Sequence, residues 1–355
     1  MSIRNRVFGL DFLRTTAIFL VLLEHGKTIY KVSFFTFPDG VDLFFVLSGF
    51  LVGNIFINTI IINNNFNLSN LFSFLVRRWF RTLPNYFLFL ILNIVLINLG
   101  LIKGIINNYL ITYFVFLQNF IIPFDFLFWE SWSLSVEEWF YFLVPLFIFI
   151  LFKFKRTLIS SKYIIIITLI IFITTPLIYR IYSYDANLSF DLFYRKLVIT
   201  RLDTISFGVL GAFLYNYYHH FWVKRKNLYF FIGLFIIIVI SNLNYSNYDF
   251  YLKTYHYSLV GFSLLLILPK FSCLEKESNK FNFFKFISKI SYSIYLSHLL
   301  IFQLIIKYLK YDNFYQTLIS YFIFLVITIL FSFLIFKYFE NPLTNLRDKF
   351  VKQHK

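Results

Sequence analysis

Charged residues are scarce in this 355-residue sequence, where Asp, Glu, Lys and Arg make up 14%, against roughly 25% in an ordinary soluble domain. Apolar residues make up 59%, which excludes an ordinary soluble globular protein. They run continuously over stretches of about 20 residues, the length that a helix needs to cross a bilayer. The alternation of apolar and polar residues that marks an outer-membrane β-barrel is absent. The expected fold class is therefore an all-α polytopic membrane protein.

Cysteine is nearly absent as well. The single residue, Cys273, excludes an intramolecular disulfide and a cysteine-based metal site, and we expect neither a metal nor a bound cofactor. The sequence also lacks a glycine-rich phosphate loop, a Gly-x-Ser-x-Gly turn and a His-Glu-x-x-His zinc motif. The formal net charge is +16, but the basic residues form short clusters between apolar runs. Such clusters are typical of membrane topology signals, so we do not expect nucleic-acid binding.

The apolar runs predict a bundle of about ten transmembrane helices. The approximate spans are 9–30, 40–62, 82–102, 134–152, 162–181, 200–218, 227–243, 254–270, 286–308 and 315–338. A weaker run at 109–122 is too short to cross, and we expect it at the interface or as a re-entrant piece of the loop 103–133. The first run is expected to stay as an uncleaved helix, because no small-residue cleavage site follows it.

The distribution of Lys and Arg predicts the orientation. With the N-terminus inside, most basic residues fall in cytoplasmic segments, so the positive-inside rule favours both termini in the cytoplasm. We expect a multi-pass protein of the cell membrane, plasma or inner. Residues 1–340 are expected to form one transmembrane domain, followed by a short basic cytoplasmic tail, 341–355, without an appended extracytoplasmic domain.

Ionisable residues inside the expected spans are candidates for function, because a charge at the bilayer centre costs about 2.5 kcal/mol or more. The first span has the densest set. Arg14 and His25 lie eleven positions apart and share a helical face, with a separation of about 16 Å along the axis. Asp11 lies on that face too. One interpretation is an interfacial Asp11–Arg14 pair with a packed histidine, and the other is a polar track through the bundle.

Two further clusters have both a structural and a functional interpretation. Asp42 and Ser48 belong to the run Gly-Val-Asp-Leu-Phe-Phe-Val-Leu-Ser-Gly at the start of the second span. The acid suits a helix N-terminus, and the Ser-Gly step suits close helix packing. Arg77, Arg78 and Arg81 lie at the expected cytoplasmic boundary of the third span. They suit a positive-inside anchor, or a clamp that binds phosphate oxygens bidentately.

Later spans add three more sites. Glu137 and Glu138 lie at the start of the fourth span, and adjacent residues differ by about 100° on a helix, so at least one carboxylate must point into the bundle. Arg201 and Asp203 form an expected i,i+2 charge pair that suits a structural role. His298 lies in mid-span, where a lone histidine is more often a packed hydrogen-bonding residue than a base.

Taken together, these residues resemble the acyltransferase-3 family of integral membrane acyltransferases. The resemblance runs from Gly9-Leu10-Asp11-Phe12-Leu13-Arg14 to Phe339-Glu340-Asn341-Pro342. It rests on the Arg-x10-His spacing, the Gly-Val-Asp-Leu-Phe-Phe-Val-Leu-Ser-Gly-Phe-Leu run, the Arg-x-x-Arg pair and the Trp-Ser-Leu-Ser-Val-Glu-Glu block, in that order. Two positions depart from the family pattern: Glu24 stands where an aromatic or apolar residue is frequent, and Trp139 stands where Gln is frequent.

The resemblance implies transfer of an acyl group, commonly acetyl from acetyl-CoA, onto a hydroxyl of a carbohydrate or other acceptor. A surface polysaccharide or its lipid-linked precursor is the acceptor we favour. His25 is the expected general base, because neutral imidazole is poised near neutral pH, with Glu137 or Glu138 orienting it or binding sugar hydroxyls. The expected donor-binding residues are Arg14, Arg77, Arg78 and Arg81, and the further candidates are Asp11, Glu24, Asp42, Ser48, Arg201, Asp203 and His298.

Two other functions remain open from the sequence. A transporter or flippase for a lipid-linked glycan or acyl donor would suit ten spans and buried polar groups equally well. The absence of evident inverted repeats, and the pairing of an arginine cluster with a base on another helix, favour the enzyme. A non-catalytic membrane scaffold would not need so many buried ionisable groups.

Overall fold

The computed structural model describes residues 7–30, 39–58, 67–123, 126–154, 160–243, 248–275, 282–309 and 313–350. All regular secondary structure within these ranges is helical. The long helices are α1 (Phe8–Tyr30), α2 (Gly40–Phe56), α3 (Leu68–Asn98), α5 (Ser131–Lys153), α6 (Ser161–Tyr182), α7 (Leu202–Tyr217), α9 (Lys226–Ser241), α11 (His256–Ser272), α12 (Phe283–Tyr308) and α13 (Phe314–Ile335). The short ones are α4 (Leu110–Phe114), η2 (Phe190–Arg195), α8 (His219–Lys224), α10 (Asp249–Thr254), η4 (Phe336–Glu340) and α14 (Asn341–Phe350).

Each expected span overlaps one long helix, and the end of the second span, 59–62, lies outside the described residues. Within the described ranges, five segments are long and apolar enough to cross a membrane: Leu68–Asn98, Ser131–Lys153, Ser161–Tyr182, Phe283–Tyr308 and Phe314–Arg347. Helices α2, α9 and α11 are apolar but shorter. Over the described ranges the protein is therefore confirmed as all-helical, with helices long and apolar enough to cross a membrane, whereas the number of about ten crossings stays a prediction.

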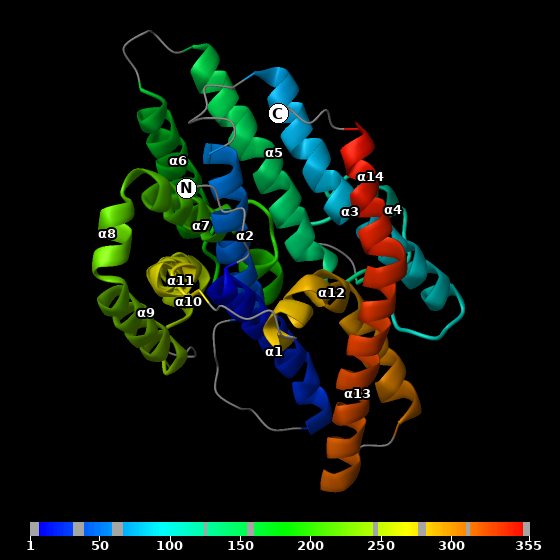
Figure 1. Ribbon diagram of the computed structural model, residues 1–355. Helices are drawn as coiled ribbons and strands as arrows, with labels where there is room; N and C mark the ends of the chain where they lie inside the picture. The colour runs from blue at the N-terminus through cyan, green and yellow to red at the C-terminus, as the bar shows by residue number, and fades with distance from the viewer. Residues whose placement is uncertain are drawn as a thin grey trace.

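The helices are arranged around α1 and α2. Helices α3, α5, α13 and α14 lie toward one side of the molecule and α8, α9 and α11 toward the other, with α1 and α2 between them (Figure 1). Helix α1 packs against α2 and α12, and α2 packs extensively against α7.

Glycines allow α2 and α7 to approach closely. A Cβ atom at Gly49 would lie 2.2 Å from the backbone oxygen of Ile205, and one at Gly208 would lie 2.2 Å from that of Val46. Neither backbone oxygen can move away without displacing its helix. The close-packing interpretation of the Ser-Gly step in α2 is therefore confirmed.

The third expected span, 82–102, begins too late. Helix α3 starts at Leu68, where the Asn67 side chain accepts a hydrogen bond from the Asn70 amide at 2.8 Å and caps the helix. The arginine cluster 77–81 consequently lies inside the helix rather than before it. Basic side chains hide such a helical start from a search for apolar runs.

The expected non-crossing run 109–122 contains only the five-residue helix α4. Its turns are fixed by side chains of the long helices: the Tyr86 hydroxyl donates to the Tyr113 carbonyl, and the Trp139 indole donates to the Phe116 carbonyl, both at 2.8 Å. Buried Asn119 donates to the carbonyls of Trp132 and Lys196. The run is therefore a folded connection that joins α3, α5 and the segment before α7.

The expected tail also has structure. Residues 341–350 form α14, which packs against α3 and η4. The boundary at residue 340 between a domain and a tail stays a prediction, but the first ten residues of that tail belong to the packed bundle.

Candidate functional site

Two separate cavities lie along the α1–α2 pair, and no residue lines both. The larger, of about 740 Å³, is lined by His25 and we name it the His25 cavity. The smaller, of about 310 Å³, is lined by five arginines and we name it the arginine cavity. The sequence-predicted site residues divide between the two.

The His25 cavity is lined by both polar and apolar residues. The polar residues are Glu24, His25, Asp39, Asp42, Lys103, Asp191, Arg195, Lys196, Ser241, His256 and Gln303. The apolar residues include Ile237 and Ile240 of α9, Val260 of α11 and Phe302 of α12. Trp129, which is 42% exposed, also faces this cavity. Such a space suits a substrate that has hydroxyl groups next to an apolar part.

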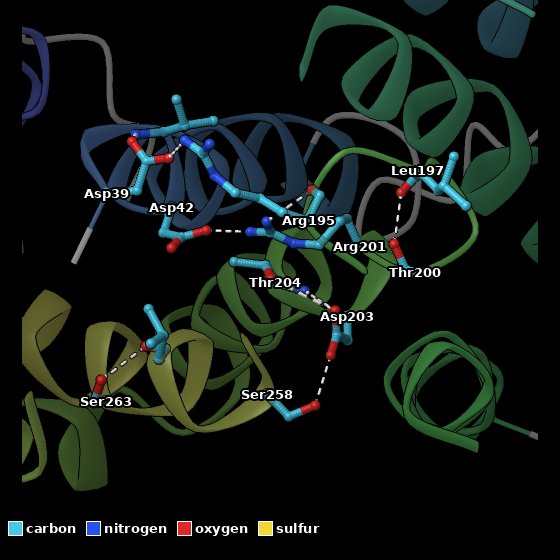
Figure 2. A network of polar contacts seen from close by, with 12 residues as sticks. Asp39, Asp42, Arg195, Leu197, Thr200, Arg201, Asp203, Thr204, Ser258 and Ser263 are labelled. Atoms are coloured by element: carbon cyan, nitrogen blue, oxygen red, sulfur yellow. Dashed lines mark hydrogen bonds and ion pairs between the residues drawn. The ribbon is translucent and has the colours of Figure 1, made fainter. Parts of the chain in front are cut away.

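A network of ion pairs joins the charged side chains that line the His25 cavity. Arg195, at the end of η2, pairs with Asp39, which directly precedes α2 (Figure 2). Arg195 also bonds Asp191 at 2.7 Å, and Lys196 bonds the second Asp191 oxygen at 2.5 Å. Burial would raise the pKa of Asp39, but the Arg195 guanidinium holds that pKa below its usual value. The pKa of Asp191 is likewise lowered by Arg195 and Lys196 despite burial. Both carboxylates are therefore charged near neutral pH.

A second layer of charges lies deeper. Arg201 pairs with Asp42 (Figure 2). Its guanidinium also stacks over the Tyr257 ring, with the central carbon 3.6 Å from the ring centre. Asp203 instead pairs with Arg180 at 2.7 Å and accepts a hydrogen bond from the Ser258 hydroxyl at 2.6 Å. The expected ion pair between Arg201 and Asp203 is thus wrong, because Arg201 pairs with Asp42 and Asp203 pairs with Arg180. Both ion pairs are almost completely buried, which suits a structural role.

His25 is half-buried near the end of α1, and its ring lies next to that of His298, with centroids 5.0 Å apart. His298 is fully buried in α12, and its Nδ1 lies 2.6 Å from the Tyr295 carbonyl oxygen. Glu24, beside His25 in sequence, also lines the cavity. The structure therefore brings together His25, Glu24, His298 and Asp42 from the expected candidates.

The arginine cavity collects guanidinium groups from three helices. They belong to Arg14 of α1, Arg77, Arg78 and Arg81 of α3, and Arg347 of α14. Arg78 is anchored, because it pairs with Glu137 at 3.2 Å and lies 3.3 Å above the Tyr141 ring centre. A cavity of this charge would bind an anion with several phosphate groups.

The two expected glutamates also lie on this side. Glu137 accepts a hydrogen bond from Ser48 at 2.8 Å besides its pair with Arg78, and Glu138 accepts one from Thr82 at 2.8 Å. The expected partnership of either glutamate with His25 is therefore wrong in this structure. The helical periodicity correctly predicted that at least one of the two carboxylates points into the bundle. It could not predict which neighbouring helix that carboxylate contacts.

Asp11 lines neither cavity. It is buried and accepts a hydrogen bond from Ser288 of α12 at 2.7 Å, which ties α1 to that helix. A continuous polar track through α1 is consequently not formed, because Arg14 and His25 open into separate cavities.

Several site residues escaped the sequence analysis. They are Asp39, Lys103, Asp191, Arg195, Lys196 and His256 in the His25 cavity and Arg347 in the arginine cavity. Asp39 had one signal, since an Asp directly before a helix is a common N-cap, and it accepts a bond from the Val41 amide at 3.0 Å. The others lie in connections or in the expected tail, where no periodic pattern marks them.

Among the described residues, no group of three or more His, Cys, Asp or Glu side chains is placed to hold a metal ion. What the site offers is an imidazole with charged neighbours in one cavity and an anion-binding cluster in the other. This combination suits proton transfer to and from a substrate that is gripped by its phosphates elsewhere.

Comparisons with known proteins agree with this chemistry. A family model described as an acyltransferase domain matches residues 7–337. A Staphylococcus aureus (strain COL) protein named "Putative O-acetyltransferase" is 27% identical over 373 residues, which cover 94% of this chain and 56% of that protein. The Listeria monocytogenes peptidoglycan O-acetyltransferase OatA is 26% identical over 166 residues, covering 43% of this chain and 26% of OatA.

A viral protein is also similar to this chain. A protein of Acidianus two-tailed virus named "Putative acetyltransferase" is 27% identical over 204 residues, covering 55% of each chain. This chain spans only about half the length of the curated Staphylococcus relatives that it matches. No solved structure matches it.

Proposed function

Because this chain belongs to the acyltransferase-3 family, we propose that it is a membrane O-acyltransferase that moves an acetyl group from acetyl-CoA onto a hydroxyl of a surface polysaccharide or its lipid-linked precursor. The observation that carries the proposal is the placement of a histidine cavity and an arginine cavity on the same pair of helices. One supplies a base and the other supplies cations for the phosphates of a donor.

The donor binds through the arginine cavity. Arg14, Arg77, Arg81 and Arg347 hold the phosphates of CoA, while Arg78 is oriented by Glu137 and Tyr141. Arg14 and His25 lie about 16 Å apart along α1. The pantetheine arm of CoA is long and flexible enough to extend from a phosphate toward the other cavity. Between the two cavities it passes the α1–α2 pair, where Tyr295 and Phe44 line the donor side.

The reaction takes place at His25. Its imidazole removes the proton of the acceptor hydroxyl, whose oxygen attacks the thioester carbonyl; the C–S bond breaks, and the CoA thiolate takes the proton back from His25. The carboxylate of Asp39, in the same cavity, stabilises the imidazolium that forms in between. The net result is an acetyl ester and free CoA.

The acceptor occupies the His25 cavity. Its volume of about 740 Å³ and its mixed polar and apolar lining suit a sugar unit attached to a lipid. Trp129 offers an exposed aromatic face on which a sugar ring stacks. Trp132 and Tyr113 do not offer such a face, because both are buried. The relative OatA is named for peptidoglycan, which supports a cell-envelope glycan as the class of acceptor.

The orientation follows from the donor, since CoA is cytoplasmic. The arginine cavity then opens to the cytoplasm and the His25 cavity to the outer face. Both termini lie on the cytoplasmic side of the cell membrane. Replacing Cys273 by serine and placing a single cysteine in the loop 103–133 tests this arrangement. Labelling of that cysteine by an impermeant reagent from outside supports it, and labelling only from the cytoplasmic side contradicts it.

The enzymatic proposal is tested with membranes that contain the wild-type chain or His25→Ala at equal abundance. Acetyl-labelled acetyl-CoA is added, and the label is followed into glycolipid and polysaccharide fractions. Transfer by the wild type that is lost in the variant supports the proposal and identifies the acceptor fraction. If neither transfers label, the proposal fails for this donor, and transport of a lipid-linked glycan becomes the next function to measure.

A further inference from the structure

His298 carries a polar atom that the proposed reaction does not yet use. The side chain is completely buried, and its Nδ1 lies 2.6 Å from the carbonyl oxygen of Tyr295 one helical turn earlier. A carbonyl oxygen can only accept a hydrogen bond. The neutral imidazole of His298 therefore carries its hydrogen on Nδ1, which leaves a lone pair on Nε2.

This Nε2 atom has no hydrogen-bond partner among the described residues. Buried polar atoms in that condition are uncommon, because each one loses its bond to water without gaining another. The neighbouring ring is that of His25, with centroids 5.0 Å apart and planes inclined by 51°. Two imidazoles joined edge to edge by an N–H···N bond have centroids about 5 Å apart, since that bond spans about 3 Å between nitrogens.

In the structure the two rings are neighbours but are not hydrogen-bonded to each other. We propose that His298 is the positioning residue of His25: when the His25 ring turns toward it, its Nε2 accepts a hydrogen bond from one ring nitrogen of His25 and so leaves the other nitrogen free to remove a proton in the cavity. The inference rests on the proposed function, in which His25 is the base. His298 itself does not touch substrate, because its side chain is sealed from the cavity. The contact selects one tautomer of His25 and one orientation of its ring.

The surroundings make α12 a rigid support for this contact. The Tyr295 hydroxyl is bonded to Ser133 of α5 at 2.7 Å, and the Ser297 and Ser332 hydroxyls are 2.9 Å apart and join α12 to α13. Helix α1 packs directly against α12. The nitrogen of His298 is thus held in place from three helices while His25 lies at the cavity edge.

Two substitutions separate positioning from mere packing. In His298→Asn the side-chain amide can still donate to the Tyr295 carbonyl, but nothing accepts a bond from His25. In His298→Gln the amide oxygen reaches the place of Nε2 and can still accept it. We expect kcat to fall about tenfold or more in His298→Asn with an unchanged KM for acetyl-CoA, and to be largely retained in His298→Gln. A purely structural histidine would give equal losses or the reverse order, which overturns the proposal.

The failure of this inference and that of the proposed function are distinguishable. Loss of activity in His25→Ala alone, with His298→Asn equal to the wild type, leaves the enzyme and removes the role of His298. Absence of transfer by the wild type contradicts the proposed function instead.

A measurement that does not depend on turnover is the ¹⁵N spectrum of the six histidines in the intact wild-type protein, assigned with single His→Asn variants. We expect His298 as the Nδ1–H tautomer with a hydrogen-bonded Nε2. An Nε2–H tautomer, or a free Nε2, overturns the proposal even if the variants do not accumulate.

Discussion

Arg14 and His25 lie on the same helix, eleven residues apart, and open into different cavities. Helix α1 therefore connects an anion-binding site to a histidine site without joining them into one polar channel. A molecule with phosphates at one end and a reactive thioester at the other fits this separation. The same division places Glu137 with the arginines and Asp39 with His25, so each cavity has its own carboxylate.

Arg347 tests the donor side. Its guanidinium comes from α14, beyond the part of the chain that the family model matches, and lines the arginine cavity. We expect Arg347→Ala to raise the KM for acetyl-CoA about tenfold with little change in kcat, because a charge-assisted hydrogen bond contributes about 1.5 kcal/mol or more. Initial rates at varied acetyl-CoA measure this. Arg225→Ala, an exposed arginine that lines neither cavity, is the matched control. An unchanged KM in Arg347→Ala removes α14 from the donor site.

Asp39 tests the acceptor side. Asp39→Asn keeps a side-chain oxygen that can cap α2 but removes the charge beside Arg195 and His25. Since the imidazolium of His25 then loses a stabilising carboxylate, we expect kcat to fall about tenfold while the KM for acetyl-CoA is unchanged. Asp249→Asn, which changes an exposed carboxylate that lines neither cavity, should leave both values unchanged. If Asp39→Asn raises the KM for acetyl-CoA about tenfold, Asp39 acts in donor binding, which contradicts its placement beside His25.

The deep ion pair of Arg180 and Asp203 is expected to stabilise the fold without taking part in turnover. Both side chains are fully buried, and Arg180 also bonds the carbonyls of Thr254 and Thr200. Arg180→Ala leaves the Asp203 carboxylate buried without its cation, which typically costs about 3 to 5 kcal/mol. We expect a lower thermal midpoint in detergent and lower abundance, whereas the protein that remains folded keeps its KM for acetyl-CoA. If Arg180→Ala unfolds at the same temperature as the wild type, the Arg180–Asp203 pair contributes nothing to the stability of the fold.

Glu130 gives a pH-dependent prediction. It lies directly before α5, is 4% exposed and has a carboxyl oxygen without a partner among the described residues. Burial raises the pKa of this carboxyl from 4.5 to about 8. The folded state therefore binds the proton more tightly than the unfolded state, so this group's contribution to stability falls as the pH rises from about 4.5 to about 8.

The variant Glu130→Gln removes that dependence. We expect it to match the wild type in thermal midpoint near pH 5 and to be more stable near pH 9, where the wild type must hold a buried charge. Unfolding curves of the purified proteins at the two pH values measure the difference. Parallel pH dependence in both proteins would show that Glu130 is not protonated in the folded state.

The helices were accessible to sequence analysis because their signal is local. Each apolar run of sufficient length predicted one helix, and the errors concern ends, as at α3, where the basic residues 77–81 continue the helix beyond its apolar part. The motif residues Arg14, His25, Arg78 and Arg81 were also found, because a charge inside an apolar run is conspicuous. Asp191, Arg195 and Arg347 were missed because charged residues in connections and near a chain end are common and carry no such signal.

The sequence by itself determined an all-helical membrane protein of the acyltransferase-3 family and the residues most costly to bury, since hydropathy and motif spacing are properties of the chain alone. Only the tertiary structure decided which of those residues meet. Glu137 was free to face any neighbour until α5 packed beside α3, and Arg201 and Asp203 were neighbours in sequence whose side chains found Asp42 and Arg180 instead. The physical reason is that a buried charge must find its partner in space, and the packing of helices far apart in the sequence sets which partner is within reach.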